Sequence, residues 1–518
     1  MSKDILSQDT KRESGKDAQR MNIYAAKLVS EAIRSTLGPK GMDKMLVDGY
    51  GNVTVTNDGV TILREIEVDH PAAKMIVEVA KTQEAQVGDG TTTAVILAGQ
   101  LLEKAQELLD NNIHPTIIAR GYRLAEIKAQ EILLKLSKPY KESDLQKISE
   151  TAMTGKGAEE AKELLSKILL QAIKHVSKHT KEIDSQDIKI EKKVGGKIKD
   201  TSLIRGVVLD KEKTHSSMPT EIKDAKIALI DSAIEIRVPE ADAKVNITSP
   251  SQIQSFLDME EEMIKKLVNK IISTGANVVL CQKGIDELAQ HFFAQKGIYA
   301  VRRVRKSDMA RLSKATNAKI ITDIKEMTSK DLGYAGNVKE VKVADEYMTY
   351  ITNCKKPAAV SIIVRGSTEH IADEVKRALE DALGDLISVL RTKRIVAGAA
   401  ATEMQLSKQL LGYSQSLAGR EQLAVKAFCE SLNIIPKTLA ENAGLDPIDV
   451  ITKLQSAHEK NPHSAINVYT GNIMDSYKKG IIEPLEIKTQ AISSATDVAI
   501  MILRIDDVIL ASKKEAEE

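Results

Sequence analysis

The order of hydrophobic patterns along this chain restricts its fold more than any other feature. Residues 21–137, and the stretch from residue 370 onward, carry apolar side chains at helical spacing between short glycine-containing loops. Between them, residues 206–209 and 225–230 read as strands, and over residues 275–324 short strands alternate with short helices, which is typical of an α/β layer. We therefore expect a multidomain protein with helical ends and an α/β middle.

Size and charge narrow the classes of function. A chain of 518 residues exceeds what one hydrophobic core usually organises, so about three domains are expected. The 74 Lys and Arg residues are balanced by 73 Asp and Glu residues, which argues against nucleic acid as the main partner. No uninterrupted apolar run is long enough to cross a bilayer, so no membrane span is expected.

The cysteines and the N-terminus indicate the compartment. Cys281, Cys354 and Cys429 are widely separated, and no two of them have the spacing of a metal site. The first twenty residues lack the apolar stretch of a secretory signal. These features predict a protein of the reducing cytoplasm.

Several elements can be placed from the sequence. We expect a β-hairpin from residues 45–47 and 53–56, and a mainly helical, highly charged segment over residues 139–200. A helix over residues 253–272 carries one apolar stripe, which predicts a core-facing helix rather than a partner-binding one. The preceding residues 237–249 are polar and aperiodic, and they predict a projecting excursion whose exposed end meets a partner.

A Gly-Asp-Gly-Thr-Thr-Thr run over residues 88–93 leads into a helix. Its glycines permit close approach of an anion, and the helix start offers unpaired N–H groups and a positive dipole end. Asp89 is a plausible Mg²⁺ ligand, because that ion is commonly held by one or two carboxylates plus substrate phosphates. Taken alone, however, the run favours an ordinary helix-capping turn, and it is neither a P-loop nor a dinucleotide fingerprint.

The order of five loops along the chain carries a more specific signal. Residues 37–41, 57–61, 88–93, 154–157 and 480–484 are short loops with the sequences LGPKG, NDGVT, GDGTTT, TGKG and GIIEP. With them, the sequence resembles the group II chaperonins, the family of the archaeal thermosome and the eukaryotic cytosolic chaperonin. The resemblance covers essentially the whole chain.

The resemblance implies three domains in a discontinuous order. Residues 1–140 and 398–518 would form an equatorial ATPase domain, and residues 141–205 and 360–397 an intermediate hinge domain. Residues 206–359 would form an apical substrate-binding domain. Its helical protrusion, at about residues 235–265, would serve as a built-in lid.

The resemblance also implies a nucleotide site for ATP and Mg²⁺. Asp58 and Asp381 match carboxylates that position or activate the attacking water, and Asp89 matches the Mg²⁺ ligand. Asp381 would reach the site only when the intermediate domain swings down, so that hydrolysis requires closure. The remaining matched nucleotide-binding positions are Leu37, Gly38, Pro39, Gly90, Thr91, Thr92, Thr93, Thr154, Gly155, Lys156, Gly398, Ala399, Glu483 and Lys488.

One segment departs from the family pattern. Where the family usually has three consecutive glycines, this chain has Gly398 followed by Ala399 and Ala400. Two methyl groups there would crowd the ribose or base, or restrict a backbone that needs positive φ. We hypothesise weaker or slower nucleotide handling, and a tolerated local repacking is the alternative.

The function implied by the resemblance is that of an ATP-dependent chaperone subunit. It would bind non-native proteins and, with sibling subunits in a homo- or hetero-oligomeric double ring, enclose them in a cavity, with Mg²⁺-dependent ATP hydrolysis driving lid closure. The alternative is a specialised ring subunit with an impaired nucleotide site that tunes the composition and stability of a hetero-oligomer. A scaffold for RNA or membranes is disfavoured by the near-neutral charge and the absence of basic, aromatic-rich segments.

Overall fold

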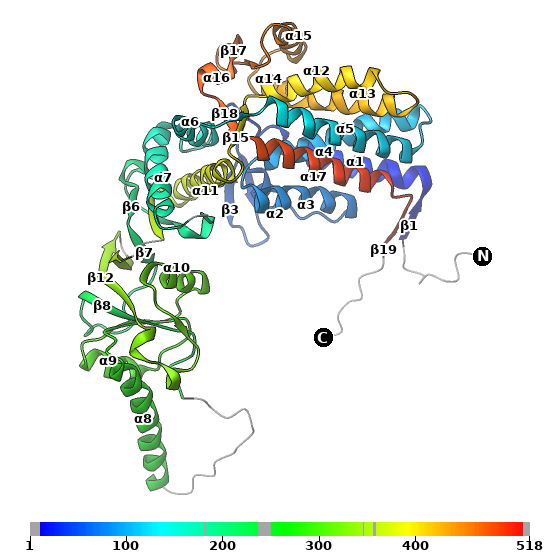
Figure 1. The fold of residues 1–518 in the computed structure, drawn as a ribbon. Helices are drawn as coiled ribbons and strands as arrows, with labels where there is room; N and C mark the ends of the chain where they lie inside the picture. The colour runs from blue at the N-terminus through cyan, green and yellow to red at the C-terminus, as the bar shows by residue number, and fades with distance from the viewer. Residues whose placement is uncertain (1–10, 181–182, 237–249, 345, 356–358, 511–518) are drawn as a thin grey trace. The chain divides into compact units, whose positions relative to one another are not determined.

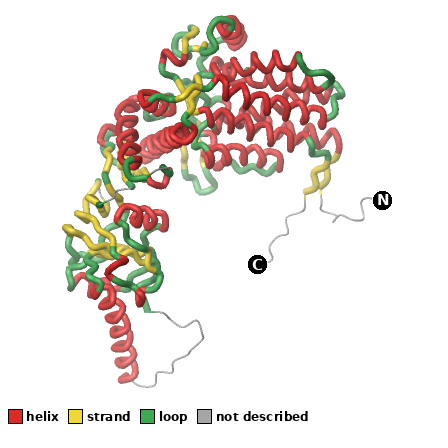
Figure 2. The backbone as a smooth tube through the Cα atoms, viewed as in Figure 1, coloured by secondary structure: helices red, strands yellow, loops and turns green. Residues whose placement is uncertain are grey.

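The computed structural model describes residues 11–180, 183–236, 250–344, 346–355 and 359–510. The chain comprises two compact units: a terminal unit, formed by residues 1–166 and 377–518, and a middle unit, formed by residues 167–376. The predicted helical ends and α/β middle are confirmed (Figure 2). The finer division into three domains stays a prediction.

The terminal unit is a bundle of long helices drawn from both ends of the chain (Figure 1). Helix α17 packs against α4 and α5, and α13 packs against α5, so the C-terminal stretch completes the core begun by the N-terminal one. The bundle helices are α1 (Gly15–Arg34), α3 (Pro71–Gln86), α4 (Thr91–Asp110), α5 (Pro115–Leu136), α12 (Ala401–Gln415), α13 (Glu421–Leu432) and α17 (Leu485–Leu503).

The bundle core is built from aliphatic side chains with few aromatic ones. Tyr122 is fully buried, its hydroxyl donates to the carbonyl of Leu101 over 2.7 Å, and its ring meets that of Phe428 edge-on at 5.7 Å. The phenol is thus satisfied inside an apolar interior, as a buried tyrosine requires. No helix of the described ranges is long and apolar enough to cross a membrane.

Short strands and helices fasten the bundle and carry its loops. The hairpin expected at residues 45–56 is confirmed as β2 paired with β3, and β1 pairs with β19 near the two ends of the chain. A three-stranded sheet, in the order β18-β15-β4, joins three distant segments. The elements are β1 (Lys11–Ser14), β2 (Lys44–Val47), β3 (Val53–Thr56), α2 (Gly59–Glu65), β4 (Lys138–Pro139), α6 (Glu142–Met153), β15 (Arg394–Ala397), α14 (Ile434–Asn442), α15 (Pro447–His458), β16 (Ser464–Ile466), β17 (Ile473–Asp475), α16 (Ser476–Lys479), β18 (Ile482–Pro484) and β19 (Asp507–Leu510).

The middle unit is organised by a mixed sheet in the order β10-β9-β8-β12-β13-β7, with β11 paired to β8. Alternate residues of β8 face opposite sides: Ile227 and Leu229 lie in a cluster with residues of α10, whereas Ala228 and Ile230 lie with those of α8 and α9. The elements are β7 (Gly206–Leu209), β8 (Glu221–Ile230), α8 (Pro250–Ser273), β9 (Val278–Cys281), α9 (Glu287–Gln295), β10 (Tyr299–Val301), α10 (Lys306–Thr316), β11 (Ile320–Ile321), β12 (Gly333–Val343) and β13 (Glu346–Cys354).

Helix α8 confirms the predicted core-facing helix over its C-terminal half. Ile264, Val268 and Ile271 are buried against the sheet, whereas Met259 and Met263 are about half exposed. The excursion predicted for residues 237–249 lies outside the described residues.

One prediction is wrong: residues 188–194 are not helical. They form strand β5 (Ile188–Val194), which pairs in parallel with β14 (Val360–Gly366), and β6 (Ser202–Ile204) pairs with the other edge of β14. Its first four residues alternate apolar and charged side chains, but three consecutive charged residues, 191–193, interrupt this period of two. Helix α7 (Lys162–Ser177) precedes this sheet, and α11 (Glu369–Thr392) follows it and runs from the middle unit into the terminal unit.

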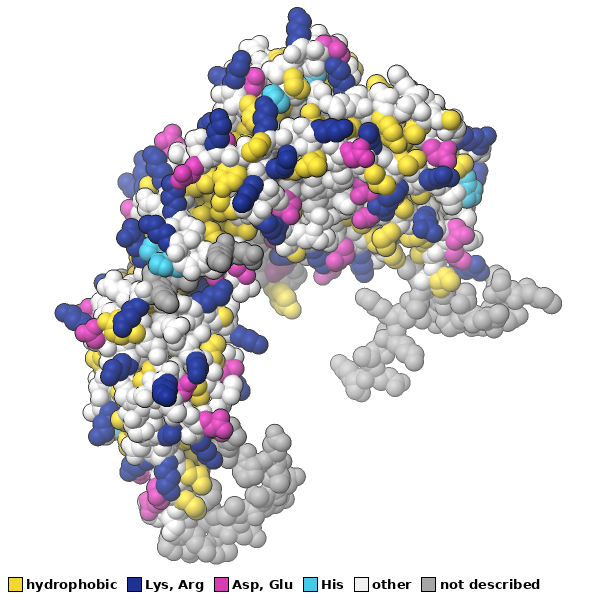
Figure 3. All heavy atoms as spheres, viewed as in Figure 1, with side chains coloured by type: hydrophobic (Ala, Val, Ile, Leu, Met, Phe, Trp, Pro, Cys, Tyr) yellow, Lys and Arg dark blue, Asp and Glu magenta, His cyan; other side chains and the backbone are white. Residues whose placement is uncertain are grey.

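Surface charge is mixed in both units. On the face shown in Figure 3, lysine and arginine side chains are interspersed with aspartate and glutamate, in keeping with the balanced totals of the sequence.

Candidate functional site

The loops singled out in the sequence meet at one end of the helical bundle. Gly155 has a φ of 79°, and a Cβ there would lie 2.6 Å from Cα of Pro39, so only glycine allows these two backbones to touch. The Asn57 side-chain amide donates to the carbonyl of Gly155 over 3.1 Å. Three loops, 37–39, 57–59 and 154–156, are therefore in contact.

The outer members of these loops are fixed by their own helices. The Asn442 side-chain amide donates to the carbonyl of Leu37 over 2.9 Å, which holds the loop after α1. The Thr154 hydroxyl donates to the carbonyl of Glu150 over 2.7 Å at the end of α6. Leu37 packs beside Leu439, and Gly38 has a φ of 83°.

The Gly-Asp-Gly loop opens helix α4. Gly90 is its N-cap with a φ of 81°, and the N-cap makes no side-chain hydrogen bond, while Asp89 Oδ1 accepts from the Gly90 N–H over 2.7 Å. The Gln83 amide donates to the carbonyls of Asp89 and Ile487 over 2.8 and 3.3 Å, which ties the loop to α17. A 20-residue helix with its first N–H groups uncapped is a ready anion-binding end.

Asp58, predicted to position the attacking water, also caps helix α2. Its carboxylate accepts from the Thr61 N–H and hydroxyl over 3.0 and 2.6 Å, so it caps α2. The Thr56 hydroxyl accepts from the Asp58 N–H over 3.1 Å and from the guanidinium of Arg377 on α11. The loop that carries Asp58 is thereby joined to the helix that carries Asp381.

Helix α11 brings a second carboxylate to the loops. Asp381 forms an ion pair with Lys156, and each side chain is about a fifth exposed. Burial alone would lower the pKa of Lys156, but the carboxylates of Asp381, Asp89 and Asp58 raise it above its ordinary value. Burial raises the pKa of Asp381, Lys156 opposes the rise, and the charges of Asp89 and Asp58 add to it. The predicted catalytic and metal-binding side chains thus share one electrostatic environment.

A further carboxylate, Asp385, was missed by the sequence reasoning. It follows Asp381 by one turn of α11, is 2% exposed, and its Oδ1 has no hydrogen-bond partner among the described residues. Burial, and next the charge of Asp89, raise the pKa of Asp385 well above its ordinary value. The spacing of four between the two aspartates was the available signal, because such residues lie on one face of a helix.

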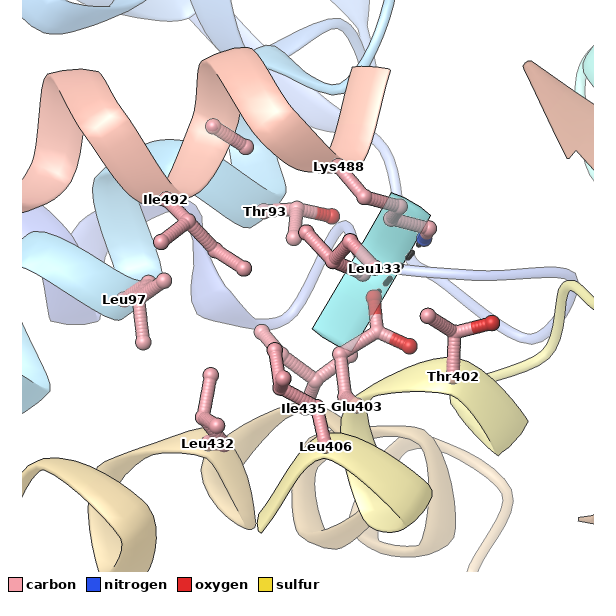
Figure 4. Close-up of a pocket in the computed structure, with 11 residues that line it drawn as sticks. Thr93, Leu97, Leu133, Thr402, Glu403, Leu406, Leu432, Ile435, Lys488 and Ile492 are labelled. Atoms are coloured by element: carbon pink, nitrogen blue, oxygen red, sulfur yellow. Dashed lines mark ion pairs between the residues drawn. The ribbon is translucent and has the colours of Figure 1, made fainter. Parts of the chain in front are cut away.

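A second group of charges lies where the ribose and base are predicted. Lys488 Nζ on α17 is 2.8 Å from Glu403 Oε1 on α12 and 2.5 Å from Glu483 Oε2 on β18. Lys488 and Glu403 are over nine-tenths buried, and Figure 4 shows their ion pair. A Cβ at Gly398 would lie 2.6 Å from the other oxygen of Glu483, so the backbone at Gly398 lies directly against this carboxylate. Glu403 is the second residue that the sequence reasoning missed.

The cavity beside this group is small and apolar. Its volume of about 10 Å³ is room for one water molecule at most, and leucine and isoleucine side chains of six helices make up most of its wall (Figure 4). Thr93, predicted to contact phosphate, lines this cavity together with Glu403 and Lys488. The cavity is a packing gap in the bundle and not a pocket for a nucleotide.

The departure at Ala399 and Ala400 is a backbone feature. Both residues have positive φ, 55° and 63°, and they are the one consecutive non-glycine pair of this kind in the described chain. The Ala400 methyl is buried in a cluster with Ile96 and Ile435, and Ala399 packs at the edge of another, next to Ala465. The part of the hypothesis that concerned positive φ is confirmed, while its effect on nucleotide stays a prediction.

The residues present fit a nucleotide-bound Mg²⁺. Among the described residues, no three His, Cys, Asp or Glu side chains are grouped so as to hold a metal ion by themselves. Mg²⁺ instead takes one or two carboxylates and completes its shell with phosphates and water. Asp89 supplies one carboxylate, and the orphaned Oδ1 of Asp385, on which the charge of Asp89 acts, is an unsatisfied acceptor.

Comparison with known proteins agrees with this geometry. The profile of the TCP-1/cpn60 chaperonin family matches residues 29–513. A thermosome subunit of Methanocaldococcus jannaschii is 55% identical over 99% of this chain and 96% of its own length. A thermosome subunit beta of Archaeoglobus fulgidus and a thermosome subunit of Pyrococcus horikoshii are each 55% identical over 99% of this chain, and over 96% and 95% of their own lengths. The chain belongs to the TCP-1/cpn60 chaperonin family and is a chaperonin of the thermosome type.

Proposed function

We propose that the terminal unit of this chaperonin subunit hydrolyses ATP with Mg²⁺ and that this reaction drives the folding cycle. The chain is a group II chaperonin, and its function is that of a molecular chaperone. The observation that carries the ATPase proposal is the gathering of Asp58, Asp89, Asp381 and Lys156 around the uncapped start of α4. Phosphoryl transfer needs mainly positioning and charge neutralisation, which such a group provides.

The roles follow from the contacts. The N–H groups at the start of α4 receive phosphate, and Asp89 holds Mg²⁺, which supplies charge neutralisation on the phosphates. Asp58 and Asp381 orient the attacking water and accept its proton as the bond between the terminal phosphorus and the leaving oxygen breaks, giving ADP and phosphate. Glu483 and Lys488, held by Glu403, face the ribose and base beside Gly398.

Lys156 links nucleotide binding to the carboxylates. In the structure the partner of Lys156 is Asp381. A terminal phosphate competes for the same ammonium group, and Asp381 is then free to face the water. Loss of that phosphate after hydrolysis restores the ion pair, so Lys156 reports the state of the nucleotide to α6 and α11.

The larger assembly is part of the proposal. We infer a double ring of this chain with copies of itself or sibling subunits, which encloses non-native proteins in the cytoplasm and closes a built-in lid. The three-domain division predicted from the sequence assigns client binding to residues 206–359. The alternative of a subunit with an impaired nucleotide site is less favoured, because the carboxylates and Lys156 stand together and the methyl of Ala400 packs into an apolar cluster.

The experiment is Mg²⁺-dependent ATP hydrolysis by the purified full-length chain, with the size of the assembly measured by light scattering. We expect the double variant Asp58→Ala, Asp381→Ala to lose at least a hundredfold in kcat, because two water-orienting carboxylates are removed. Asp446 caps α15 as Asp58 caps α2, so Asp446→Ala is the matched control for a lost helix cap and keeps its activity. Unchanged hydrolysis in the double variant would contradict the assignment.

A further inference from the structure

Asp385 is a buried acid with one carboxylate oxygen that lacks a hydrogen-bond partner among the described residues. It is 2% exposed, and the oxygen without a partner is Oδ1. Leaving a buried carboxylate oxygen unpaired is costly, and native proteins rarely retain one without a bound partner. We therefore expect the missing partner of Asp385 Oδ1 to be part of a ligand that the site binds.

Two glycine–aspartate pairs place Asp385 beside Asp89. A Cβ at Gly88 would lie 3.1 Å from Cα of Gly384, so the Gly-Asp-Gly loop and α11 touch through backbone. Each of these glycines is followed by an aspartate, and Asp89 is the charge with the largest influence on Asp385. Asp381, one turn earlier on the same face of α11, pairs with Lys156. The helical turn that carries Asp385 thus lies against the loop that carries Asp89, close enough for the two carboxyl groups to interact electrostatically.

Several acids share one lysine at this point. Asp381, Asp89 and Asp58 act on Lys156, whose one positive charge is paired with Asp381. The same lysine, together with Asp89, Glu483 and Asp381, acts on Asp385. Burial and the neighbouring carboxylates raise the pKa of Asp381 and of Asp385, so the ionised forms of both acids are disfavoured, and phosphate groups would add further negative charge. A divalent cation favours the ionised forms and offsets the charge of the phosphates.

We propose that Asp385 is a second carboxylate of the Mg²⁺ site and acts with Asp89 on the ion that accompanies the nucleotide. The inference rests on the proposed function, and it adds a residue that the family resemblance did not imply. It also explains why α11 carries two aspartates four residues apart: Asp381 serves Lys156 and the water, and Asp385 serves the metal.

The test is a coupling measurement between Mg²⁺ and ADP, made by titration calorimetry on the assembled full-length protein. ADP affinity is measured with excess Mg²⁺ and again in EDTA, for the wild type and for Asp385→Asn. We expect Mg²⁺ to tighten ADP binding in the wild type and this tightening to fall about tenfold or more in the variant. In EDTA the variant binds ADP at least as tightly as the wild type, because a negative charge near the phosphates is gone.

A matched control separates metal binding from folding. Ser388 is buried one turn further along α11, and its hydroxyl donates to Glu486 Oε2 over 2.8 Å, away from the metal carboxylates. Ser388→Ala lowers the melting temperature but keeps the Mg²⁺ effect on ADP. An equal loss of ADP affinity with and without Mg²⁺ in Asp385→Asn, or an unchanged Mg²⁺ effect, overturns the assignment of Asp385. If the wild type binds no ADP in either buffer, the proposed function itself fails.

Discussion

Each unit of the molecule buries a lysine among carboxylates, and the two groups are arranged differently. In the middle unit, Lys189 pairs with Asp308 and Glu191, each at 3.1 Å, and also donates to the carbonyl of Val208 over 3.0 Å. Arg311 donates to the other oxygen of Asp308 over 2.9 Å. Two positive charges meet two negative ones. In the terminal unit, three aspartates act on Lys156, and one oxygen of Asp385 nearby has no hydrogen-bond partner among the described residues.

The difference separates a group of charges that serves the fold from one that serves a ligand. A buried ionic group is tolerable when its members satisfy one another, and the group around Lys189 does so within the chain. The group around Lys156 is not satisfied within the described chain, and the proposed Mg²⁺ and phosphate would complete it. Among the described residues, the buried carboxylate oxygens with neither a hydrogen bond nor an ion pair, Asp385 Oδ1 and Glu403 Oε2, both lie in the terminal unit. Sites that violate local physical rules are where function is to be expected.

The largest loss of stability is expected when the ionic group around Lys189 is broken. We expect Lys189→Met to lower the free energy of unfolding by about 3–5 kcal/mol, because Asp308 and Glu191 would remain as buried charges. Denaturant unfolding followed by circular dichroism measures this loss. Lys192, on the same strand, is about a third exposed and pairs with Asp373, so Lys192→Met should cost less than about 1 kcal/mol. Equal losses in the two variants would remove the distinction between buried and exposed pairs.

A smaller loss of stability is expected at Lys156. The variant Lys156→Met should lower the free energy of unfolding by about 1–3 kcal/mol, because Asp381, already with a raised pKa and about a fifth exposed, can take up a proton instead of staying charged. The same unfolding assay, run beside Lys189→Met, gives the ranking, and ATP hydrolysis should fall sharply. A loss as large as that of Lys189→Met would show that the Lys156 group also serves mainly the fold.

Much of the site was predictable because its loops have local signatures. Glycines with aspartate or threonine at a helix start are visible in the sequence, and their order along the chain carried the resemblance to chaperonins. The contacts among Pro39, Asn57 and Gly155 agree with the expectation that these loops share one site. Asp385 and Glu403 have no such signature, because each lies inside a regular helix where acids are common on the surface. Their burial depends on packing between segments far apart in sequence.

The strand β5 was missed for a related reason. Its charged residues suggested a solvated helix, yet Lys189 and Glu191 are buried because they satisfy each other and Asp308. The charge of Lys189 can be buried because Asp308 on α10 pairs with it, and no local sequence pattern predicts a partner so far away in the chain. From the sequence it could be said only that alanine would be strained at position 399 if the backbone there needed a positive φ. The family resemblance implied glycines at that place, but it did not give the backbone angles.

The smallest predicted change in stability concerns Ala399 and Ala400, two residues of the terminal unit whose backbone is strained. A left-handed alanine costs about 1–2 kcal/mol relative to glycine, while a fully buried methyl contributes about 0.8 kcal/mol. Ala399→Gly, which loses a half-buried methyl, should therefore raise the free energy of unfolding by up to about 1 kcal/mol. Ala400→Gly, which loses a methyl that is 3% exposed, should change it little. Unfolding of both single variants measures the ranking, and ADP titration of the double variant tests nucleotide handling. An affinity equal to that of the wild type would show that the alanines affect only the backbone, and the strain would then be a local repacking that the buried methyl of Ala400 helps to offset.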